Sequence, residues 1–343
     1  MIPIPTATAL SALREQVHSA GTDTGLNLIA FSGGVDSSLV AALVHEVFPE
    51  RAVAVIGVSA SLPQEQLELA RSVATHIGIP LRELATREGD VPEYIANLGQ
   101  SCYHCKTTLY QTLEGLARAL AEALPAADLE ANEAGARSRE ARAAGSASGR
   151  SPVVLFNGTN ADDLQDPTRL GLLAAQEHRV ESPLQHLTKQ EVRAAAQTLG
   201  LPNWSYAASP CLRSRLAYGV RATPAELARV EQAERLVRRA LELPFQENLR
   251  VRALVDGSAR IELDPAQWPR LDSMLPDLER VLLALGFRAL HRDVFRTGTL
   301  SGFAQLDRVQ LDRVQLDRVH SDRVHSDRVP SESVLLHEPV LEV

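Results

Sequence analysis

The feature that most constrains this chain is an apolar run that passes through a glycine pair into a helical pattern. Leu26 to Phe31 (LNLIAF) predicts a buried strand, SGGVDSS follows it, and SSLVAALVHEVF predicts a helix. Glycine lets a backbone approach a ligand closely, and the free N–H groups at a helix N-terminus favour an anion. The turn lacks the lysine of a Walker A loop. The sequence therefore predicts an anion site of another kind between this strand and this helix.

Strand and helix signals alternate from this turn to about residue 200. Three more strands are predicted in AVAVIGVS, PLRELAT and VVLFNG. One helix is predicted from Pro63 with Gly78 as its C-cap, and another from Thr188, which is spaced to form a capping box with Glu191. This alternation indicates an α/β fold with a Rossmann-like parallel sheet, in which ligands bind beyond the carboxyl ends of the strands.

The pattern changes after residue 215. A long amphipathic helix, a hairpin around Asp256-Gly257, a helix over 265–285 and a strand near RALHRDV predict a smaller α+β domain. We therefore predict one domain over residues 1–215 and a second over residues 216–303.

Two stretches are interpreted as additions. Residues 121–150 are rich in Ala, Glu, Arg, Gly and Ser, and they predict a mobile, partly helical insertion. QLDRV occurs three times from Gln305, and HSDRV then occurs twice from His320. A period of five builds no continuous face on a helix or a strand, so residues 304–343 predict a disordered tail. A pentapeptide β-helix is the alternative.

Composition limits the classes of partner. The formal net charge of −8 argues against a nucleic-acid partner, which usually requires a basic surface. No apolar run has the length of a membrane span, and the N-terminus lacks the pattern of a signal peptide. We therefore expect a cytoplasmic protein with no membrane partner, in which three cysteines do not build a disulfide framework.

The residues of SGGVDSS suit a phosphate ligand. Its glycines allow close approach, its serines supply hydroxyls, and a carboxylate among such groups predicts Mg²⁺. An ordinary glycine turn is the alternative, but the strand, the hydroxyls and the helix all agree with a ligand site. The candidate residues are Ser32, Gly33, Gly34, Asp36, Ser37 and Ser38, with Asp36 as the Mg²⁺ ligand.

Several separated motifs resemble one family. SGGVDSS is similar to the pyrophosphate loop (PP-loop) of the N-type ATP pyrophosphatases, which implies the adenine nucleotide alpha hydrolase-like fold. VSASLP, CYHCK, NGTNADDLQD, SPLQHLTKQEVR and SPCLRSRLAYG follow in order. Together, from about residue 10 to about residue 302, they resemble the LarE family of sulfurtransferases. The insertion departs from the family, as does Asp166 to Leu172, where an arginine contact near Arg169 is expected to be shifted or lost.

This resemblance implies an activity. The loop, together with Ser59, is expected to bind ATP and Mg²⁺, and ATP is expected to be split between its α and β phosphates. The implied substrate is pyridinium-3,5-biscarboxylic acid mononucleotide, one carboxylate of which is adenylated and then converted to a thiocarboxylate for the nickel-pincer cofactor of lactate racemase. The resemblance also suggests a homo-oligomer.

The three cysteines are Cys102 and Cys105, in a CxxC pair, and Cys211. Buried apolar side chains, a zinc site with a histidine such as His104, redox exchange and an iron–sulfur cluster are the possible interpretations. Some LarE proteins carry only the equivalent of Cys211 and give up its sulfur, whereas others bind a [4Fe–4S] cluster on three cysteines. We therefore hypothesise a cluster on these three residues, with sulfide on its open iron as the transferred atom.

Arginines lie near the third cysteine and on a later strand. Arg213 and Arg215 flank Cys211, where cations favour a thiolate and can bind a substrate phosphate. Arg250 and Arg252 alternate on a predicted strand, and the resemblance suggests that they bind phosphate or the substrate nucleotide. Solvated surface side chains are the alternative for all of them.

Polar residues also follow the fourth predicted strand. Asn160, Asp162 and Asp163 are expected at the ligand edge of the sheet, where they could serve Mg²⁺ or the ribose. Capping of the following helix is the alternative.

Other functions stay open at this point. A tRNA 2-thiolation enzyme also joins a pyrophosphate loop to three cysteines, and salt-dependent tRNA binding would identify it. A nucleotide-binding module with a structural metal site would bind ATP without releasing pyrophosphate. An amidotransferase-like synthetase is disfavoured, because no glutaminase domain accompanies the loop.

Overall fold

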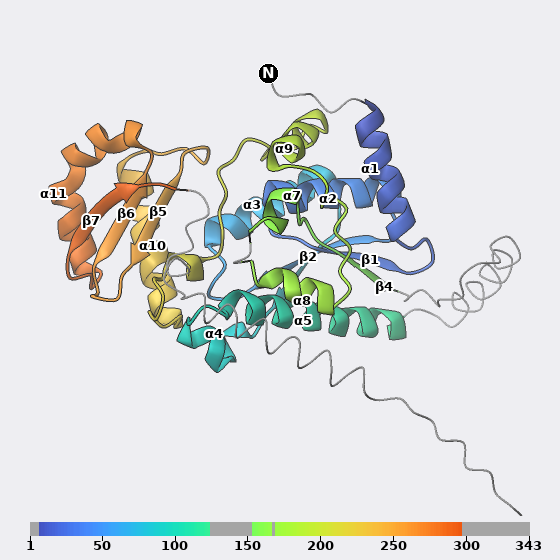
Figure 1. Ribbon diagram of the computed structural model, residues 1–343, viewed down its shortest axis with the longest axis horizontal. Helices are drawn as coiled ribbons and strands as arrows, with labels where there is room; N and C mark the ends of the chain where they lie inside the picture. Colours follow the sequence, from blue (N-terminus) through green and yellow to red (C-terminus); the bar gives the residue numbers. More distant parts are fainter. Residues whose placement is uncertain (1–6, 124–152, 167–168, 297–343) are drawn as a thin grey trace, which may run out of the picture. The chain divides into compact units, whose positions relative to one another are not determined.

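The computed structural model describes residues 7–123, 153–166 and 169–296 (Figure 1). The described residues belong to one compact unit, which holds a four-stranded and a three-stranded sheet. The repeat tail and residues 124–150 of the insertion lie outside the described residues, so the predictions about them stay predictions. No helix in the described ranges is both long enough and apolar enough to cross a membrane.

The larger sheet is parallel, with the strand order β3-β2-β1-β4. Successive residues of its central strand, Leu28 and Ile29, point to opposite faces of the sheet, and both are fully buried. The predicted α/β class is therefore confirmed. The strands are Leu26–Ala30 (β1), Ala52–Val58 (β2), Leu81–Ala85 (β3) and Val153–Phe156 (β4).

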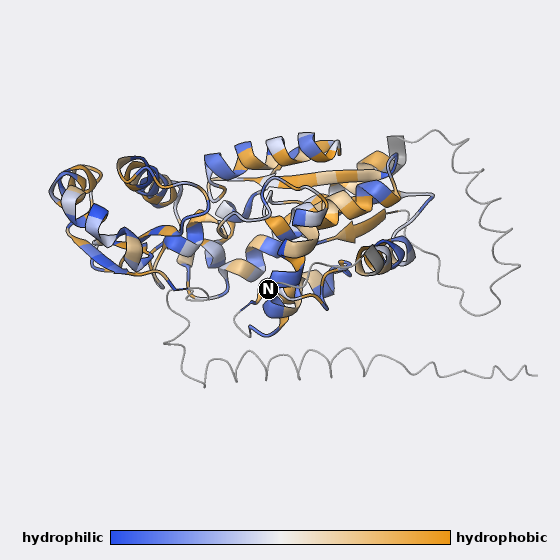
Figure 2. Ribbon diagram, turned by 90° about the horizontal axis from the view of Figure 1, so that it is seen from above, coloured by the Kyte–Doolittle hydropathy of each residue, from blue (hydrophilic) through white to orange (hydrophobic). Residues whose placement is uncertain are grey.

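Helices cover both faces of this sheet (Figure 1). The core that contains Ile29 is completed by Ala7–Ala20 (α1), Val35–Val47 (α2), Gln64–Ile77 (α3) and Lys189–Thr198 (α9). The core that contains Leu28 is completed by Ser101–Ala123 (α5) and Gly171–Glu177 (α8). Hydrophobic and hydrophilic residues alternate along these helices (Figure 2), as expected for helices that cover a sheet.

Local signals end and begin these helices as predicted. Gly78 is the C-cap of α3 in the left-handed conformation, with φ of 82°. Thr188 and Glu191 form the predicted capping box at the start of α9. Because all four strands are parallel, the loops that follow them leave from one edge of the sheet.

The smaller sheet has the order β5-β6-β7. Its strands are Leu249–Ala253 (β5), Ala259–Leu263 (β6) and Leu290–Val294 (β7). The predicted hairpin around Asp256-Gly257 is confirmed, since β5 and β6 pair antiparallel, whereas β6 and β7 are parallel. Pro224–Ala240 (α10) and Trp268–Ala284 (α11) share a separate core with this sheet. The α+β character is confirmed, and the boundary at residue 215 stays a prediction.

The SGGVDSS turn (residues 32–38) packs tightly against α3. Gly33 has φ of 70°, and a Cβ atom there would lie 2.7 Å from Ala70 Cα. Gly34 has φ of −76°, and a Cβ atom there would meet nothing nearer than Ser32 Oγ at 3.4 Å. Of this glycine pair, only Gly33 is required by its backbone and its neighbours.

We predict that Gly33→Ala lowers the free energy of unfolding by about 3 kcal/mol, since a left-handed alanine and a clash with a packed helix are both unfavourable. Gly34→Ala is the matched control, with an expected loss of about 1 kcal/mol because alanine is a poorer N-cap. Urea unfolding curves measure both changes. Equal losses in the two variants would contradict this account of the turn.

Candidate active site

The SGGVDSS turn is closed by its own serines. Ser37 Oγ donates a hydrogen bond to Gly34 O at 3.1 Å and accepts one from Ser32 N at 3.1 Å. Ser38 Oγ donates to the same carbonyl at 2.9 Å. Ser37 and Ser38 are buried, whereas Ser32 is exposed and Asp36 is half-buried. The side chains that a ligand can reach in this turn are therefore those of Ser32 and Asp36.

Asn203 supports the turn from a distant part of the chain. Its Nδ2 atom donates to Gly33 O at 2.7 Å and to Ser38 Oγ at 3.0 Å, and its side chain is 1% exposed. No sequence motif marks this residue, because its partners lie in another element.

Asp36 is held by groups from two other elements. Its Oδ1 atom accepts a hydrogen bond from Asn160 Nδ2 at 3.1 Å, and its Oδ2 atom pairs with Lys189 Nζ. Lys189 is the first residue of α9, so a helix distant in sequence places a lysine beside the turn. The sequence analysis missed Lys189, although lysine occurs only at positions 106 and 189 in this chain.

The polar residues after β4 act mainly as caps. Asn160 and Asp163 form a capping box for Ala161–Leu164 (α7), and Asp162 Oδ2 accepts from Lys189 N at 3.0 Å. Burial raises the pKa of Asp163, and Arg169, which pairs with it at 2.8 Å, opposes that shift. The capping interpretation is thus observed for two of these residues. Only the Asn160 side chain reaches the SGGVDSS turn directly.

The three cysteines are free, and each is half-buried. Cys102 and Cys105 lie one turn apart at the start of α5, and Cys211 precedes the short 3₁₀ helix Leu212–Arg215 (η2). Leu212 N donates to Ser61 O at 2.8 Å, which ties Cys211 to the loop after β2. Burial raises the pKa of Cys105, and interactions with Cys211 and Cys102 raise it further. The structure therefore brings the three predicted thiols into one region.

These thiols are not arranged as a metal centre. Within the described ranges, no group of three or more His, Cys, Asp or Glu side chains could hold a metal ion. Arg213, which is 5% exposed, instead donates to Cys102 Sγ at 2.6 Å and to Asn97 Oδ1 at 3.1 Å. A cation beside sulfur suits a nucleophilic thiol. The observed arrangement therefore fits thiol chemistry, and the cluster on the three cysteines stays a prediction.

Lys106 is a second cation beside the thiols, one turn after Cys102 on α5. Gly171 leaves space for its stem, since a Cβ atom there would lie 2.9 Å from Lys106 Cγ. Burial acts to lower the pKa of Lys106, but Tyr110 and the three cysteines outweigh burial and raise it. Lys106 therefore stays charged at neutral pH, and the sequence analysis did not select it.

A buried carboxylate accepts hydrogen bonds from two serines that follow β2. Glu88, in the 3₁₀ helix Glu88–Asp90 (η1), accepts hydrogen bonds from Ser59 Oγ at 2.5 Å and from Ser61 Oγ at 3.1 Å. The hydroxyl of Ser59, predicted to bind ATP, is therefore used by the protein. Tyr94, in Pro92–Ala96 (α4), lies near the thiols, and burial followed by Cys211 raises its pKa.

The remaining predicted arginines are buried, and their guanidinium groups donate hydrogen bonds to other groups of the protein. Arg215 forms a two-pronged pair with Glu234 at 3.0 and 2.8 Å. Arg252 donates to Glu262 Oε1 and to Ser214 O, both at 2.6 Å. Burial acts to raise the pKa of Glu234, but Arg215 outweighs it and holds that pKa below its usual value. The alternative that these arginines are solvated surface side chains is wrong.

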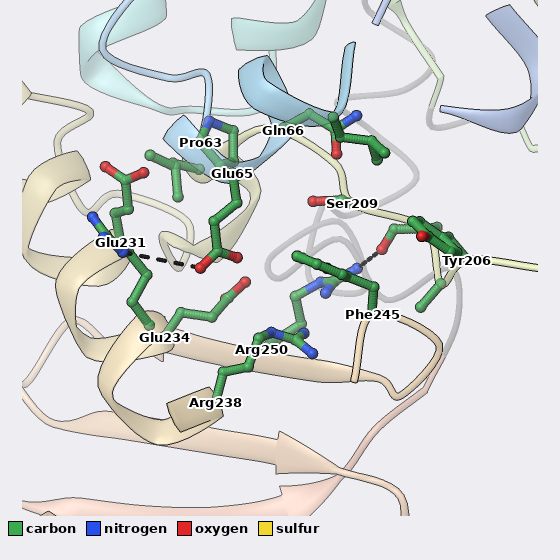
Figure 3. Close-up of a pocket in the computed structure, with 15 residues that line it drawn as sticks. Pro63, Glu65, Gln66, Tyr206, Ser209, Glu231, Glu234, Arg238, Phe245 and Arg250 are labelled. Atoms are coloured by element: carbon green, nitrogen blue, oxygen red, sulfur yellow. Dashed lines mark hydrogen bonds and ion pairs between the residues drawn. The ribbon is translucent and has the colours of Figure 1, made fainter. Parts of the chain in front are cut away.

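Arg250 lines a small cavity of about 60 Å³ (Figure 3). It donates to Leu249 O at 2.5 Å and to Ala208 O, and burial, followed by the charge of Arg215, lowers its pKa to about 9. Arginine keeps its proton at neutral pH. Ser209 and Leu212, on either side of Cys211, line the same cavity. The cavity therefore lies beside the segment that carries Cys211, and it is lined by side chains of both charges: Glu65, Glu231, Glu234, Arg235, Arg238 and Arg250.

The pair Arg215–Glu234 generates a stability prediction. Glu234→Gln leaves buried cations without a counter-charge, so we expect a loss of about 3–5 kcal/mol in the free energy of unfolding. Glu242→Gln is the matched control, because Glu242 pairs with Arg270 at 2.6 Å but is 80% exposed, and we expect a loss below about 1 kcal/mol. Denaturant unfolding compares them, and similar losses would refute the buried pair as a structural element.

Comparisons with known proteins identify relatives of this chain over most of its length. A family model described as asparagine synthase matches residues 9–129. An uncharacterised protein of Synechocystis is 38% identical over 280 residues, which cover 80% of this chain and 91% of that protein. Pyridinium-3,5-bisthiocarboxylic acid mononucleotide synthase of Lactiplantibacillus plantarum is 31% identical over 284 residues, which cover 80% of this chain and 88% of that protein.

A shorter match is to a synthetase. NH(3)-dependent NAD(+) synthetase of Carboxydothermus hydrogenoformans is 40% identical over 67 residues, which cover 20% of this chain and 26% of that protein. The longer relatives extend the match over most of the chain. The chain therefore belongs to the LarE family, and it is an ATP-dependent sulfurtransferase built on a PP-loop domain.

Proposed function

We propose that this enzyme inserts sulfur into a carboxylate of pyridinium-3,5-biscarboxylic acid mononucleotide after activating that carboxylate with Mg-ATP. The relative from L. plantarum is named for the thiocarboxylate product. The proposal is supported by one short segment, residues 203–211, which connects the SGGVDSS turn with Cys211. Asn203 supports the SGGVDSS turn at its start, and Cys211 lies beside Ser61 at its end. The nucleotide turn and the thiols are thus joined by residues 203–211.

The activation site is formed by Asp36 and Lys189. A single carboxylate suits Mg²⁺, which is usually held by one or two carboxylates together with phosphate oxygens. The ammonium group of Lys189 suits the phosphates. In the structure these two side chains neutralise each other, and Mg-ATP provides a new partner for each. Mg²⁺, when bound, neutralises the charge that develops on the departing pyrophosphate.

Two displacements convert the carboxylate. A carboxylate oxygen of the substrate attacks the α-phosphorus of ATP, and pyrophosphate leaves. A sulfur nucleophile then attacks the acyl carbon, AMP leaves, and the carbon–sulfur bond of the thiocarboxylate is formed. Arg213 and Lys106 stabilise negative charge on sulfur.

Two hypotheses for the sulfur source remain. The first is the [4Fe–4S] cluster predicted on Cys102, Cys105 and Cys211, and neither displacement is written through it. The second is the sulfur of Cys211 itself, whose Cβ–S bond breaks to leave dehydroalanine. Iron and labile-sulfide analysis of anaerobically prepared protein tests the first. Loss of one hydrogen sulfide from the mass of the Cys211 peptide after turnover tests the second.

The expectations of a cytoplasmic location, a homo-oligomer and no nucleic-acid partner are part of this proposal. Light scattering on the purified protein measures the oligomer. Binding of tRNA that weakens with salt would instead support the tRNA thiolation alternative.

The thiols generate the central prediction. With ATP and the pyridinium substrate, Cys211→Ala is expected to lower thiocarboxylate formation by at least about 10²-fold, while pyrophosphate release stays within about threefold of wild type. Mass spectrometry of the product and a pyrophosphate assay measure the two steps.

Full thiolation by Cys102→Ala would exclude a mechanism that needs all three cysteines. Absence of substrate-dependent pyrophosphate release in the wild type would identify a non-catalytic binding module.

The two lysines generate a paired prediction. Lys189→Gln is expected to slow pyrophosphate release by about 10²-fold, because it removes a cation at the phosphates. Lys106→Gln is expected to leave pyrophosphate release within about threefold and to slow thiolation, because Lys106 lies beside sulfur. The same two assays separate these effects. A loss of the same step in both variants would show that the lysines do not serve separate halves of the reaction.

A further inference from the structure

The segment before Cys211, residues 204–211, is held through its carbonyl groups by arginine side chains. Arg193 of α9 donates to Trp204 O at 2.7 Å and to Tyr206 O at 2.8 Å. Arg250 of β5 donates to Ala208 O. Arg215 of η2 donates to Pro210 O, and also to Cys211 O at 3.2 Å. These guanidinium groups replace the regular hydrogen bonds that a helix or strand would give this segment.

Arg193 differs from the other two arginines in the element that carries it. Arg215 and Arg250 belong to the buried network around Glu234, in the region of the smaller sheet. Arg193 lies on α9, four residues after Lys189, and residues at this spacing share one face of a helix. Lys189 pairs with Asp36 in the SGGVDSS turn. One face of α9 therefore contacts both the nucleotide turn and the segment that leads to Cys211.

We propose that Arg193 is a positioning residue for sulfur transfer, which fixes residues 204–211 against α9 and thereby places the sulfur of Cys211 relative to the nucleotide turn. The planar fork of arginine can bind two carbonyl groups at once, which a lysine cannot do with the same geometry. Misplacement of a reacting group by about 1 Å can slow a reaction by about 10²-fold. The catalytic consequence rests on the proposed function, whereas the structural role does not.

The first experiment needs no activity. The alkylation rates of Cys211 and Cys102 by iodoacetamide are measured by peptide mass spectrometry, in the full chain, for wild type, Arg193→Gln, Arg193→Lys and Arg229→Gln. Arg229 is the matched control, because it donates to Gly286 O at 3.1 Å in the region of the smaller sheet. Hydrogen exchange of the peptide that covers residues 204–211 is followed in the same samples.

Arg193→Gln is expected to increase alkylation of Cys211 about tenfold and to leave Cys102 within about twofold, because only the segment of Cys211 loses one of its anchors. Arg193→Lys is expected to lie between wild type and Arg193→Gln, and it keeps the test decisive if the glutamine variant does not fold. Arg229→Gln is expected to change neither cysteine. Unchanged alkylation and unchanged exchange of residues 204–211 in both Arg193 variants would overturn the inference.

The second experiment separates the two chemical steps. Arg193→Gln is expected to reduce thiocarboxylate formation at least tenfold while substrate-dependent pyrophosphate release stays within about threefold, with partial rescue in Arg193→Lys. An equal fall in both steps would show a general structural role and would overturn the positioning role. If the wild type forms no thiocarboxylate, the proposed function fails, and the alkylation experiment still decides whether Arg193 holds the segment.

Discussion

The parallel register of β1, β2 and β4 is the constraint on which the site depends. Parallel pairing sends the chain out of each strand at the same edge of the sheet. The SGGVDSS turn follows β1, the serines that meet Glu88 and hold Leu212 follow β2, and Asn160 follows β4. An antiparallel neighbour would place one of these loops at the opposite edge. Strand pairing therefore gathers the first three loops of the site, and contacts from other elements close it.

Burial decides which of the ion pairs around the site can change partners. The side chains of Lys189 and Asp36 are 33% and 23% exposed, so water already reaches them and a nucleotide can replace their mutual contact. Those of Arg215 and Glu234 are 1% and 14% exposed, and separating them would leave a charge in an apolar interior. The first pair thus suits ligand exchange, whereas the second suits a fixed support for residues 210 and 211. The same residue types have different roles because their solvent access differs.

The sequence was sufficient for features that depend on local chemistry. Gly78, the Thr188–Glu191 capping box and the Asp256-Gly257 hairpin were predicted because each signal and its partner lie within a few residues. Asn203 and Lys189 were missed because their partners lie in the SGGVDSS turn, far away in the sequence. The alternation of Arg250 and Arg252 places both on one face of a strand. Their hydrogen bonds to the carbonyl groups of residues 208 and 214 depend on the tertiary structure, which the alternation does not reveal. Local patterns therefore gave the elements and the turn, but not the partners of the long polar side chains.

The three thiols share a region but not an environment, and this difference bears on the sulfur source. A guanidinium group lies on Cys102 Sγ, whereas burial raises the pKa of Cys105 and so disfavours its thiolate. Iron ligation requires a thiolate from each cysteine. Three ligands would therefore require Cys105 to ionise where it packs against apolar side chains, whereas Cys102 already accepts a hydrogen bond from a cation. Cys211 differs from both, since arginine side chains hold the carbonyl groups of its segment, and its neighbours Ser209 and Leu212 line the cavity of Arg250. The three sulfur atoms therefore differ in their neighbours, and either source of sulfur has to act through this asymmetric set.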